Sequence, residues 1–585
     1  MSMSHGVTGL SMSPSRGQSL TPAAPGDEVV KEGMVRKRIG VVPFVEYEAY
    51  QGLFLALSSL FPVEFCESER DSYAGLDALI LFDGSRDSGT QAAAAGVRCY
   101  VVLNTDEKPV HCGAATVDFG RAANLHAYFQ DQTLVDEDVK EFVPLSPLSG
   151  DEIVASREGH VLWIYRPEAK SGVDFLAMGL PKLTDDQYLC EYLQPGRFLR
   201  LLPLFHFLRD VTKDIAWTFP PLRACFMFDD PNLHSSSYGY INYRDLVQHA
   251  TNHNYHVSLA TVPIDAWRVH SKTACLVRQN PSRISLLIHG NNHTYKEMVF
   301  PGPNGYQLGL LAQALRRIER FEKNSGLEVS RVMSAPHSAC TEEMMHFMLL
   351  LGYEAACLPW DSLFRFNPHH RWSPTTGLDM VDFQGGGLPI IQRVRLRPDW
   401  NPQLRLYPDR TTGIILSGFL SQPIIPIGHH QDAAGGMELL AQVADTINRL
   451  GNVMWTDMKG IMRSNYMTKQ EGKLLRIKMY SRRIIVQVPE DIDEMLVERP
   501  WIAEDGETEM LVCKRTGTGL LKLAARRVST VIPVQPLETI ELTTVPNTAL
   551  RYSEMPSPPF RLWPLARRLM TEGRDRVLPL IFRHK

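Results

Sequence analysis

The chain has 585 residues, of which 44% are hydrophobic and 22% are charged, and its formal net charge is −4. This length is too great for one ordinary core and predicts about three or four domains, while the near balance of charge excludes nucleic acid as a general partner. Nine scattered cysteines without a C-x-x-C motif predict reduced thiols and a cytoplasmic location.

The first third of the chain divides into a tail and an α/β region. Residues 1–34 are rich in Ser, Pro and Gly and lack the apolar stretch of a secretory signal, so we expect a disordered tail. Residues 35–140 alternate short apolar strands with helical segments, which predicts a flavodoxin- or amidotransferase-like α/β domain. This region contains no Gly-rich phosphate fingerprint, so we interpret it as a structural or docking module.

The middle and later parts of the chain change pattern twice. Residues 141–219 mix strand and helix signals and are interpreted as a connecting α+β segment. Residues 220–471 repeat a strand–helix alternation over the length of a (β/α) barrel. Residues 472–556 are mainly strands separated by turns, which predicts a small β-sandwich-like domain. The fold class is therefore α/β, with a β-rich appendage.

The last segment, residues 557–585, is a basic amphipathic tail. Phe560, Trp563, Ala566 and Met570 recur in it at helical spacing, among several arginines. A basic amphipathic helix with Trp can lie on a membrane surface, so peripheral contact with the inner face of a membrane is one expectation. Docking of the helix on the protein's own core is the alternative. No apolar run reaches the roughly 18 residues that would span a bilayer.

Three predicted barrel strands end in polar residues. These are Asp229 and Asp230 in FMFDDPN, His289 with His293 in HGNNH, and His429 with His430 in PIGHHQD. Taken singly, each has an ordinary interpretation, such as a turn at Asp-Asp-Pro-Asn or a chance pair of histidines. Because the C-terminal ends of barrel strands converge on one mouth, their common position favours a metal site.

The residue types suit a catalytic metal ion. Imidazole binds zinc and similar divalent ions, and one carboxylate completes a three-ligand set that leaves positions for water and substrate. A cation would also offset the repulsion between two neighbouring carboxylates. Only one of Asp229 and Asp230 need be a ligand. The other can act as base for a water whose pKa the metal lowers toward ~7.

These motifs resemble those of a known enzyme family. FMFDDPN is similar to the first motif of the polysaccharide deacetylases, the NodB-homology family of carbohydrate esterases, usually Thr-Phe-Asp-Asp-Gly-Pro. HGNNH resembles the second, His-x-x-x-His, MSAPHS resembles the Pro-containing third, and PIGHHQD resembles the last, apolar-x-His. With an α/β layer before the barrel and strands after it, the chain is similar to the large WbmS-type branch associated with surface-polysaccharide gene sets.

The resemblance implies the family's distorted (β/α) barrel and assigns roles within it. Asp230, His289 and His293 become the ligands of a divalent metal, with zinc as the first expectation. Asp229 becomes the catalytic base. The general acid falls on His429, with His430 as its competitor.

Three departures from the family pattern stand out. Pro231 replaces the Gly after Asp-Asp and removes a backbone N–H. Ser334 takes the place of the family's Arg, which orients the base, and this puts activity in doubt. His337 replaces the aromatic residue of the third motif and is interpreted either as facing the pocket or as an ordinary turn residue.

A later segment, DFQGGGLPIIQRVRLRP, is a candidate wall of the pocket. Its Arg393, Arg395 and Arg397 are interpreted either as contacts for a phosphate or carboxylate or as the solvated side of an edge strand.

The implied function is metal-dependent removal of an N-acetyl or other acyl group from a sugar in surface-polysaccharide biosynthesis. The expected partner is a sugar, a nucleotide sugar or a lipid-linked glycan. A catalytically degenerate deacetylase fold that binds glycans or acts as a scaffold is one alternative, favoured by the missing Arg. A metal hydrolase of a non-sugar C–N bond is another. The sequence leaves the particular sugar and the oligomeric state open.

Overall fold

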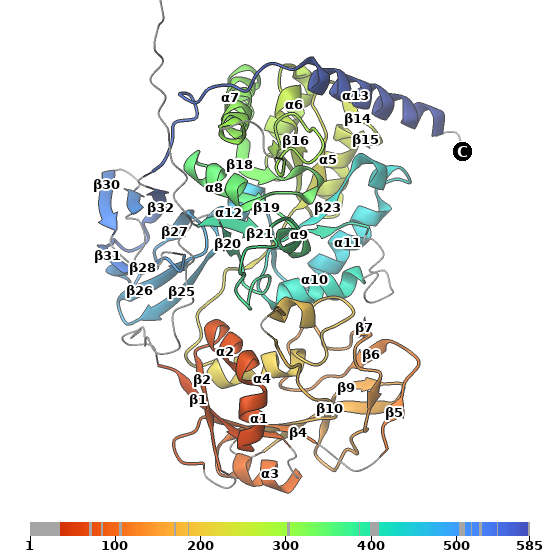
Figure 1. Ribbon diagram of the computed structural model, residues 1–585, viewed down its shortest axis with the longest axis vertical. Coiled ribbons are helices and arrows are strands. Elements are labelled where there is room, and N and C mark those ends of the chain that lie inside the picture. Colours follow the sequence, from red (N-terminus) through yellow and green to blue (C-terminus); the bar gives the residue numbers. More distant parts are fainter. Residues whose placement is uncertain are drawn as a thin grey trace, which may run out of the picture.

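The protein is described here by a computed structural model that covers residues 35–582, with gaps at 70–72, 83–85, 104–107, 169–170, 185, 301–304, 385–386, 398–408, 502–508, 516–517, 526–528 and 547. The expected tail at residues 1–34 lies outside the described residues. Three units follow one another along the chain, and a C-terminal helix returns to the middle one (Figure 1). Within the described ranges, every helix is too short or too polar to cross a bilayer.

The N-terminal unit is built on one nine-stranded sheet in the order β2-β1-β3-β4-β11-β10-β9-β6-β7. Its strands are β1 (Lys37–Val42), β2 (Val63–Glu67), β3 (Ala78–Phe82), β4 (Arg98–Val102), β6 (Thr116–Phe119), β7 (Thr133–Val135), β9 (Glu152–Arg157), β10 (His160–Pro167) and β11 (Gly172–Leu176). A separate small ladder joins β5 (Val110–His111) and β8 (Glu141–Phe142). The helices are α1 (Phe44–Ala49), α2 (Gln51–Leu60), α3 (Arg86–Ala94) and α4 (Leu202–Thr212).

This sheet differs from the predicted division of the chain. The neighbours from β2 to β11 pair in parallel, as the α/β pattern predicts, but β10, β9, β6 and β7 continue the sheet antiparallel. The sheet therefore runs past the boundary predicted at 140. The physical reason is that side chains of β9 to β11 and of α4 share one buried core with those of β1 and β3, so residues 141–219 have no core of their own.

The central unit contains a second nine-stranded sheet, in the order β20-β21-β19-β18-β17-β16-β13-β23-β22. Its strands are β13 (Phe226–Asp229), β16 (Val257–Thr261), β17 (Ile284–His289), β18 (Val329–Ser334), β19 (Ala355–Cys357), β20 (Asp382–Gln384), β21 (Leu388–Ile391), β22 (Val394–Arg395) and β23 (Pro426–Gly428). All neighbours pair in parallel except β20 with β21. The sheet stays open between β20 and β22, so it is a curled half-barrel.

Helices connect these strands in the alternation that the sequence predicts. They are α5 (Tyr243–Asn252), α6 (Ser271–Gln279), α7 (Tyr306–Ser325), α8 (Glu342–Leu350), α9 (Trp360–Phe366), α10 (Arg410–Phe419), α11 (Glu438–Asn448) and α12 (Met458–Arg463). Two short ladders, β12 (Leu222–Ala224) with β24 (Val453–Trp455) and β14 (Ser237–Tyr238) with β15 (Ile241–Asn242), complete the unit.

Local sequence explains the regularity of this unit. Every residue of β13 and β16 is buried, which is typical of parallel strands covered on both faces and accounts for their continuous apolar runs. Helix α8 begins at Thr341, whose side chain accepts from the Met344 N–H, and α7 ends at Gly326, which adopts φ 66°.

The C-terminal unit is a β-sandwich. One sheet has the order β25-β26-β28-β31 and the other β27-β32-β29-β30. The strands are β25 (Tyr466–Glu471), β26 (Leu474–Met479), β27 (Arg483–Gln487), β28 (Glu494–Glu498), β29 (Glu509–Arg515), β30 (Thr518–Ala525), β31 (Ser529–Pro533) and β32 (Thr539–Pro546). Their alternating inward residues form a separate apolar core, as the predicted sandwich requires.

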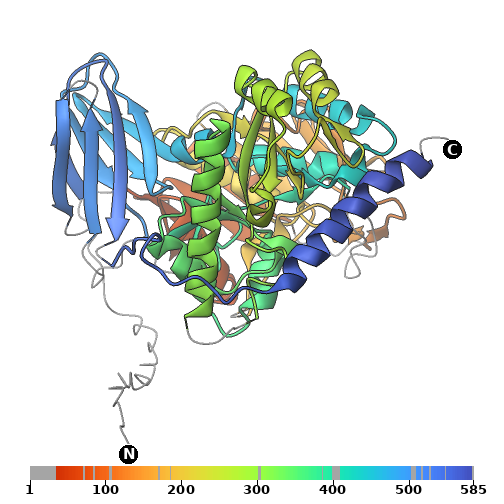
Figure 2. The ribbon, with the colours of Figure 1, turned by 90° about the horizontal axis from the view of Figure 1, so that it is seen from above.

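The last helix, α13 (Leu562–Phe582), leaves the sandwich and crosses to the central unit. Figure 2 shows it in dark blue, lying along the outside of that unit. Its contacts are with residues that follow the C-terminal ends of barrel strands, so it lies across the mouth where the sequence places the candidate site.

Candidate metal centre and active site

The predicted site residues meet at the mouth of the half-barrel. Asp229 and His289 are the last residues of β13 and β17, and His429 directly follows β23. In the sheet β13 lies between β23 and β16, and β17 lies on the other side of β16. Strand order therefore brings together residues that are up to 200 positions apart in the sequence.

Asp230, His289 and His293 form a three-donor cluster. One donor atom from each lies within 4.8 Å of the other two. Two ligand bonds of about 2.1 Å can bridge donors up to roughly 4.2 Å apart, so a small contraction would place all three on one ion. Two imidazoles and a carboxylate are the donors that zinc and similar ions prefer. The residues therefore fit the predicted metal.

Hydrogen bonds on the side away from the cluster position His289 and the loop of His293. His289 Nδ1 donates a hydrogen bond of 2.9 Å to the Ser334 carbonyl, which leaves Nε2 with a free lone pair toward the cluster. The loop carrying His293 closes around the buried carboxylate of Glu297, which accepts from the backbone N–H groups of Asn291, Asn292 and His293 at 2.8, 3.1 and 3.0 Å. The His289 ring is thus fixed by a second contact, as metal-binding histidines usually are, and the loop that carries His293 is fixed through its backbone.

The backbone around the cluster is strained. Asp230, His293 and His337 have positive φ values of 83°, 54° and 58°, a region that non-glycine residues rarely adopt. Such conformations cost about 1–3 kcal/mol each and persist where surrounding contacts enforce them, commonly at functional sites. Here they occur in the segments that directly follow β13, β17 and β18.

Asp229 is buried and is held by two side chains, Ser334 at the end of β18 and Arg393 between β21 and β22. Its Oδ1 accepts from Ser334 Oγ at 2.7 Å and its Oδ2 accepts from Arg393 Nη1 at 3.2 Å. Arg393 also donates to Ser334 Oγ at 2.6 Å and to Ser338 Oγ at 2.9 Å. The sequence interpretation of Arg393 as the solvated side of an edge strand is therefore wrong, because its side chain is only 2% exposed.

The neighbouring Arg395 and Arg397 behave differently from Arg393. Both are exposed, and Arg397 pairs with Asp432 at 3.1 Å. Ser334 and Arg393 both contact Asp229, and Arg393 supplies its guanidinium from the loop between β21 and β22.

Asp230 has an arginine of its own. Arg568 of α13 donates from Nη1 to Asp230 Oδ1 at 2.9 Å, from Nη2 to the Asp230 carbonyl at 2.6 Å, and from Nε to Asp265 at 2.6 Å. Each of the two adjacent aspartates is thus paired with a different guanidinium, one from within the barrel and one from the C-terminal helix. The like charges at the end of β13 are compensated in this way even without a cation.

These pairs determine the charge state of both carboxylates. Burial acts to raise the pKa of Asp229, but the charges of His289 and Arg393 outweigh it and hold the pKa below its ordinary value. Burial likewise acts to raise the pKa of Asp230, and His293 and Arg568 outweigh it there. Both carboxylates are therefore ionised, as a base and a ligand must be.

The structure separates the two candidate acids. His429 is exposed at the mouth, and its charge contributes to lowering the pKa of both Asp229 and Asp230. His430 is buried, and its Nε2 lies 3.4 Å from Asp575 of α13. His430 therefore faces the docked helix, and His429 is the histidine that faces the carboxylates.

His337 lies in a turn beside the three-donor cluster. Its ring is exposed and lies 5.1 Å from the ring of His293, with Tyr295 on its other side at 5.6 Å. The turn that the sequence also allowed is present, and the imidazole lies next to the ring of His293.

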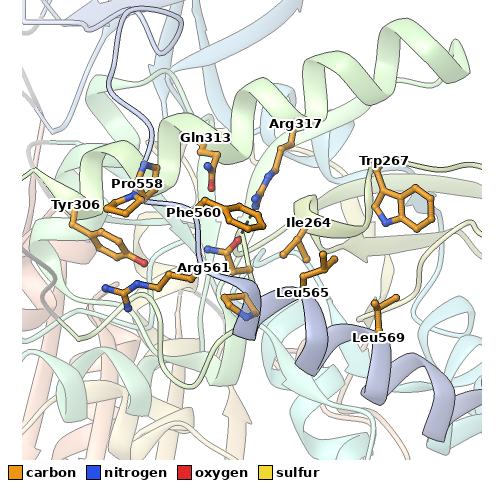
Figure 3. Close-up of a pocket in the computed structure, with 13 residues that line it drawn as sticks. Ile264, Trp267, Tyr306, Gln313, Arg317, Pro558, Phe560, Arg561, Leu565 and Leu569 are labelled. Carbon is orange, nitrogen blue, oxygen red and sulfur yellow. Dashed lines mark hydrogen bonds between the residues drawn. The ribbon is translucent and has the colours of Figure 1, made fainter.

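A pocket of about 470 Å³ lies beside the site, between α7 and the start of α13 (Figure 3). Gln313 and Arg317 point into it from α7, and Phe560, Leu565 and Leu569 line it from the tail. Arg317 also donates to Asn292 Oδ1 at 2.8 Å, next to His293, so the pocket adjoins the loop of the second motif.

Sequence reasoning missed Glu297, Arg568 and the role of Arg393. Glu297 follows His293 by four residues, a spacing that carries no signal on its own. Arg568 lies 338 positions from Asp230, in a segment that the sequence marked only as a basic amphipathic helix. Arg393 was named as a candidate wall residue, but nothing in its own segment indicates that it contacts Asp229.

No family model matches the chain, and no curated protein matches it either. Solved structures that resemble it include carbohydrate deacetylases. Agd3, described as a novel carbohydrate deacetylase, shares 9% identity at a TM-score of 0.48, over 88% of this chain and 99% of that one. A Streptococcus mutans CE4 esterase shares 13% identity at a TM-score of 0.24, over 41% and 87%. At these low similarities, any chemistry assigned to this chain rests on its own residues.

Proposed function

We propose that this protein is a metal-dependent hydrolase that removes an N-acetyl or similar acyl group from a sugar. The observation that carries the proposal is the contact of Arg393 and Ser334 with Asp229, beside the cluster of Asp230, His289 and His293. The missing motif Arg was the main support for a degenerate scaffold. A guanidinium on the same carboxylate removes that support.

The proposed division of labour follows from the contacts. A divalent cation, zinc by preference, held by Asp230, His289 and His293 would supply Lewis-acid activation of water and of the acyl carbonyl. Asp229 accepts the proton of the attacking water, since it is ionised and its orientation is fixed by Ser334 and Arg393.

The second proton transfer falls to the other side of the mouth. His429 is exposed there and donates a proton to the departing amine. His430 has a structural part in this scheme, because it faces Asp575 of α13.

A sugar, a nucleotide sugar or a lipid-linked glycan is the proposed substrate, and surface-polysaccharide biosynthesis the proposed context. Exposed rings at the mouth, His337 and Tyr295, offer faces on which a sugar could stack. The nine cysteines are all unpaired, which supports the proposal of a reducing cytoplasmic compartment.

Acetate release tests the proposal. Purified protein loaded with zinc should release acetate from N-acetylated sugars, nucleotide sugars or oligosaccharides, and a chelator should abolish the release. Arg393→Ala should lower turnover by about 10²-fold while zinc content stays near wild type, because the substitution loosens the base and leaves the ligands in place. Arg395→Ala, two residues away and exposed, is the matched control and should retain wild-type turnover.

The other outcomes identify the rival functions. Zinc binding with no acetate release from any N-acetyl sugar, but hydrolysis of a non-sugar amide, would indicate a different metal hydrolase. Absence of both zinc binding and acetate release would indicate a scaffold. Equal turnover of Arg393→Ala and wild type would contradict the role given to Arg393.

A further inference from the structure

The C-terminal helix is docked by its polar face. Arg568, Glu572 and Asp575 follow one another at helical spacing and contact Asp230, His234 and Tyr238, respectively. An amphipathic helix of a water-soluble protein normally buries its apolar stripe and exposes its charges. Helix α13 has the opposite orientation.

The apolar stripe therefore faces outward. We define the outer face of α13 by residues that are all exposed and lie on one side of the helix, namely Leu562, Trp563, Ala566, Met570 and Val577. Trp563 is 63% exposed and Leu562 70%. In Figure 2 this helix lies along the outside of the molecule. An exposed patch of this kind commonly marks an interaction site.

The apolar surface continues beyond the helix. Trp267, Tyr295 and Phe300 are each more than half exposed, and each lies in a loop that follows β16 or β17. These loops leave the C-terminal ends of the strands, on the same side as α13. Trp267 and Leu569 also line the pocket of about 470 Å³ between α13 and α7 (Figure 3).

Both acidic side chains of the helix lie on its docked side, together with Arg567 and Arg568. Glu572 and Asp575 face the barrel, with side chains 13% and 3% exposed. Among the described side chains of α13, those that are both charged and exposed are Arg574 and Arg576, and Arg561 just before the helix is exposed as well. The outer surface is thus apolar with cationic flanks, and the sequence ends in the basic residues Arg583 to Lys585, which lie outside the described residues.

We infer that the outer face of α13, with the aromatic loops at the mouth, binds the surface of a membrane that contains anionic lipids. Tryptophan and leucine at the headgroup level with flanking arginines are typical of interfacial helices, and each arginine near an anionic surface adds to the attraction. The helix stays docked on the barrel, since its polar contacts face away from the membrane. The mouth then opens along the bilayer, and, on the proposed function, the substrate is a lipid-linked glycan.

Vesicle flotation of the full-length protein tests the inference. Vesicles of phosphatidylcholine with about one third phosphatidylglycerol should bind the protein at least tenfold more tightly than phosphatidylcholine alone, and salt should weaken the binding. Trp563→Glu with Met570→Glu should reduce the affinity at least tenfold. Leu55→Glu is the matched control, because Leu55 is also 67% exposed on a helix, α2, in the N-terminal unit. That variant should bind like wild type.

A second measurement distinguishes loss of membrane contact from unfolding of the helix in the Glu double variant. Brominated lipids should quench part of the tryptophan fluorescence of the wild type. Trp563→Phe, which keeps an apolar ring, should still bind but lose the share of the quenching that comes from Trp563, leaving the share from Trp267. Unaltered binding by the Glu double variant, or no preference for anionic vesicles, would overturn the inference. A wild-type dimer in solution that the double variant converts to monomer would also overturn it, since a second copy would then cover this face.

Different results would reject the membrane-binding inference and the proposed deacetylase function. The double variant should release acetate from a soluble N-acetylated oligosaccharide at the wild-type rate, because the outer face touches no site residue. Vesicle binding without any acetate release would reject the proposed function alone. Acetate release without vesicle binding would reject the inference alone.

Discussion

The two aspartates at the end of β13 are neighbours with identical side chains, and they differ in their partners. Asp229 lies against Ser334 and Arg393, inside the barrel, and is 3% exposed. Asp230 turns outward through a positive φ toward His293 and Arg568. A strand alternates its side chains between two faces, and the φ of 83° adds a sharp turn, so the two carboxylates reach different environments.

Substitution of each aspartate by asparagine should separate these roles. Asp230→Asn removes the charge of the proposed ligand and should lower both zinc content and acetate release. Asp229→Asn should keep the zinc but lower turnover by about 10²–10⁴-fold through loss of the base. It should also destabilise the fold by about 3 kcal/mol, because Arg393 would remain buried without its counter-charge.

Metal content, thermal melting and acetate release on the same preparations check this prediction. Equal loss of zinc in both variants would mean that both aspartates are ligands. A higher melting temperature for Asp229→Asn would mean that repulsion between the two carboxylates outweighs the ion pair with Arg393.

At the scale of single elements, α13 is part of the site as well as a surface helix. Arg568 is 4% exposed and joins Asp230 to Asp265, so it provides the positive charge that both buried carboxylates need. Without it, two carboxylates at the mouth would lose their nearest cation.

Arg568→Gln should therefore lower the melting temperature of the metal-free protein, and zinc should raise that temperature more in the variant than in the wild type. The reason is that a bound cation takes over the compensation of Asp230 once the guanidinium is absent. Arg561→Gln, an exposed substitution at the start of the same segment, is the control and should change neither value. Thermal melts with and without zinc measure both quantities. An identical zinc increment in Arg568→Gln and wild type would contradict this role of Arg568.

At the scale of the whole molecule, the three units meet around a pocket of about 840 Å³. Phe61 of the N-terminal unit, Phe383 of the central unit and Tyr480 of the sandwich all line it. Two carboxylates of the central unit, Asp379 and Asp382, face the same pocket. Burial raises the pKa of Asp379 to about 6, and burial together with the charge of Asp379 raises the pKa of Asp382 to about 7.

These raised pKa values predict a dependence of stability on pH. The folded protein binds more protons than the unfolded chain between the ordinary carboxyl pKa of about 4 and about 7, so the free energy of unfolding should fall as the pH rises through that range. Asp382→Asn should raise the melting temperature at pH 8 and have little effect near pH 4. Asp491→Asn, an exposed site in the sandwich, should show no such difference between the two pH values. Melting curves of both variants at pH 4 and pH 8 check this prediction. If Asp382→Asn melts at a lower temperature than wild type at pH 8, the hydrogen bonds of Asp382 with Gly377 and Gln392 stabilise the fold more than its buried charge destabilises it.

The sequence by itself determined the local elements and the residue types that gather at the mouth. Continuous apolar runs gave the parallel strands of the half-barrel, and alternation gave the sandwich, because each pattern depends only on which faces of one strand are buried. The aspartates after FMF and the histidines of HGNNH and PIGHHQD could be grouped because they lie at the ends of predicted parallel strands, which share one edge of a sheet. The resemblance to the deacetylases then singled out Asp230, His289 and His293 as the expected ligands. The sequence also predicted an amphipathic helix in residues 557–585, because the spacing of its apolar residues depends on the helix alone.

Tertiary structure decided which partners hold those residues and which way the last helix faces. Arg393 contacts Asp229 across 164 positions and Arg568 contacts Asp230 across 338, and neither pairing follows from any local period. A helical stripe fixes the sides of α13 but not the side that docks. The docked side is set by the carboxylates and rings at the mouth. They form buried polar contacts with the polar face of α13, so its apolar face stays exposed. The N-terminal sheet likewise extends past residue 140 because β11 pairs with β4, a long-range contact that composition cannot show.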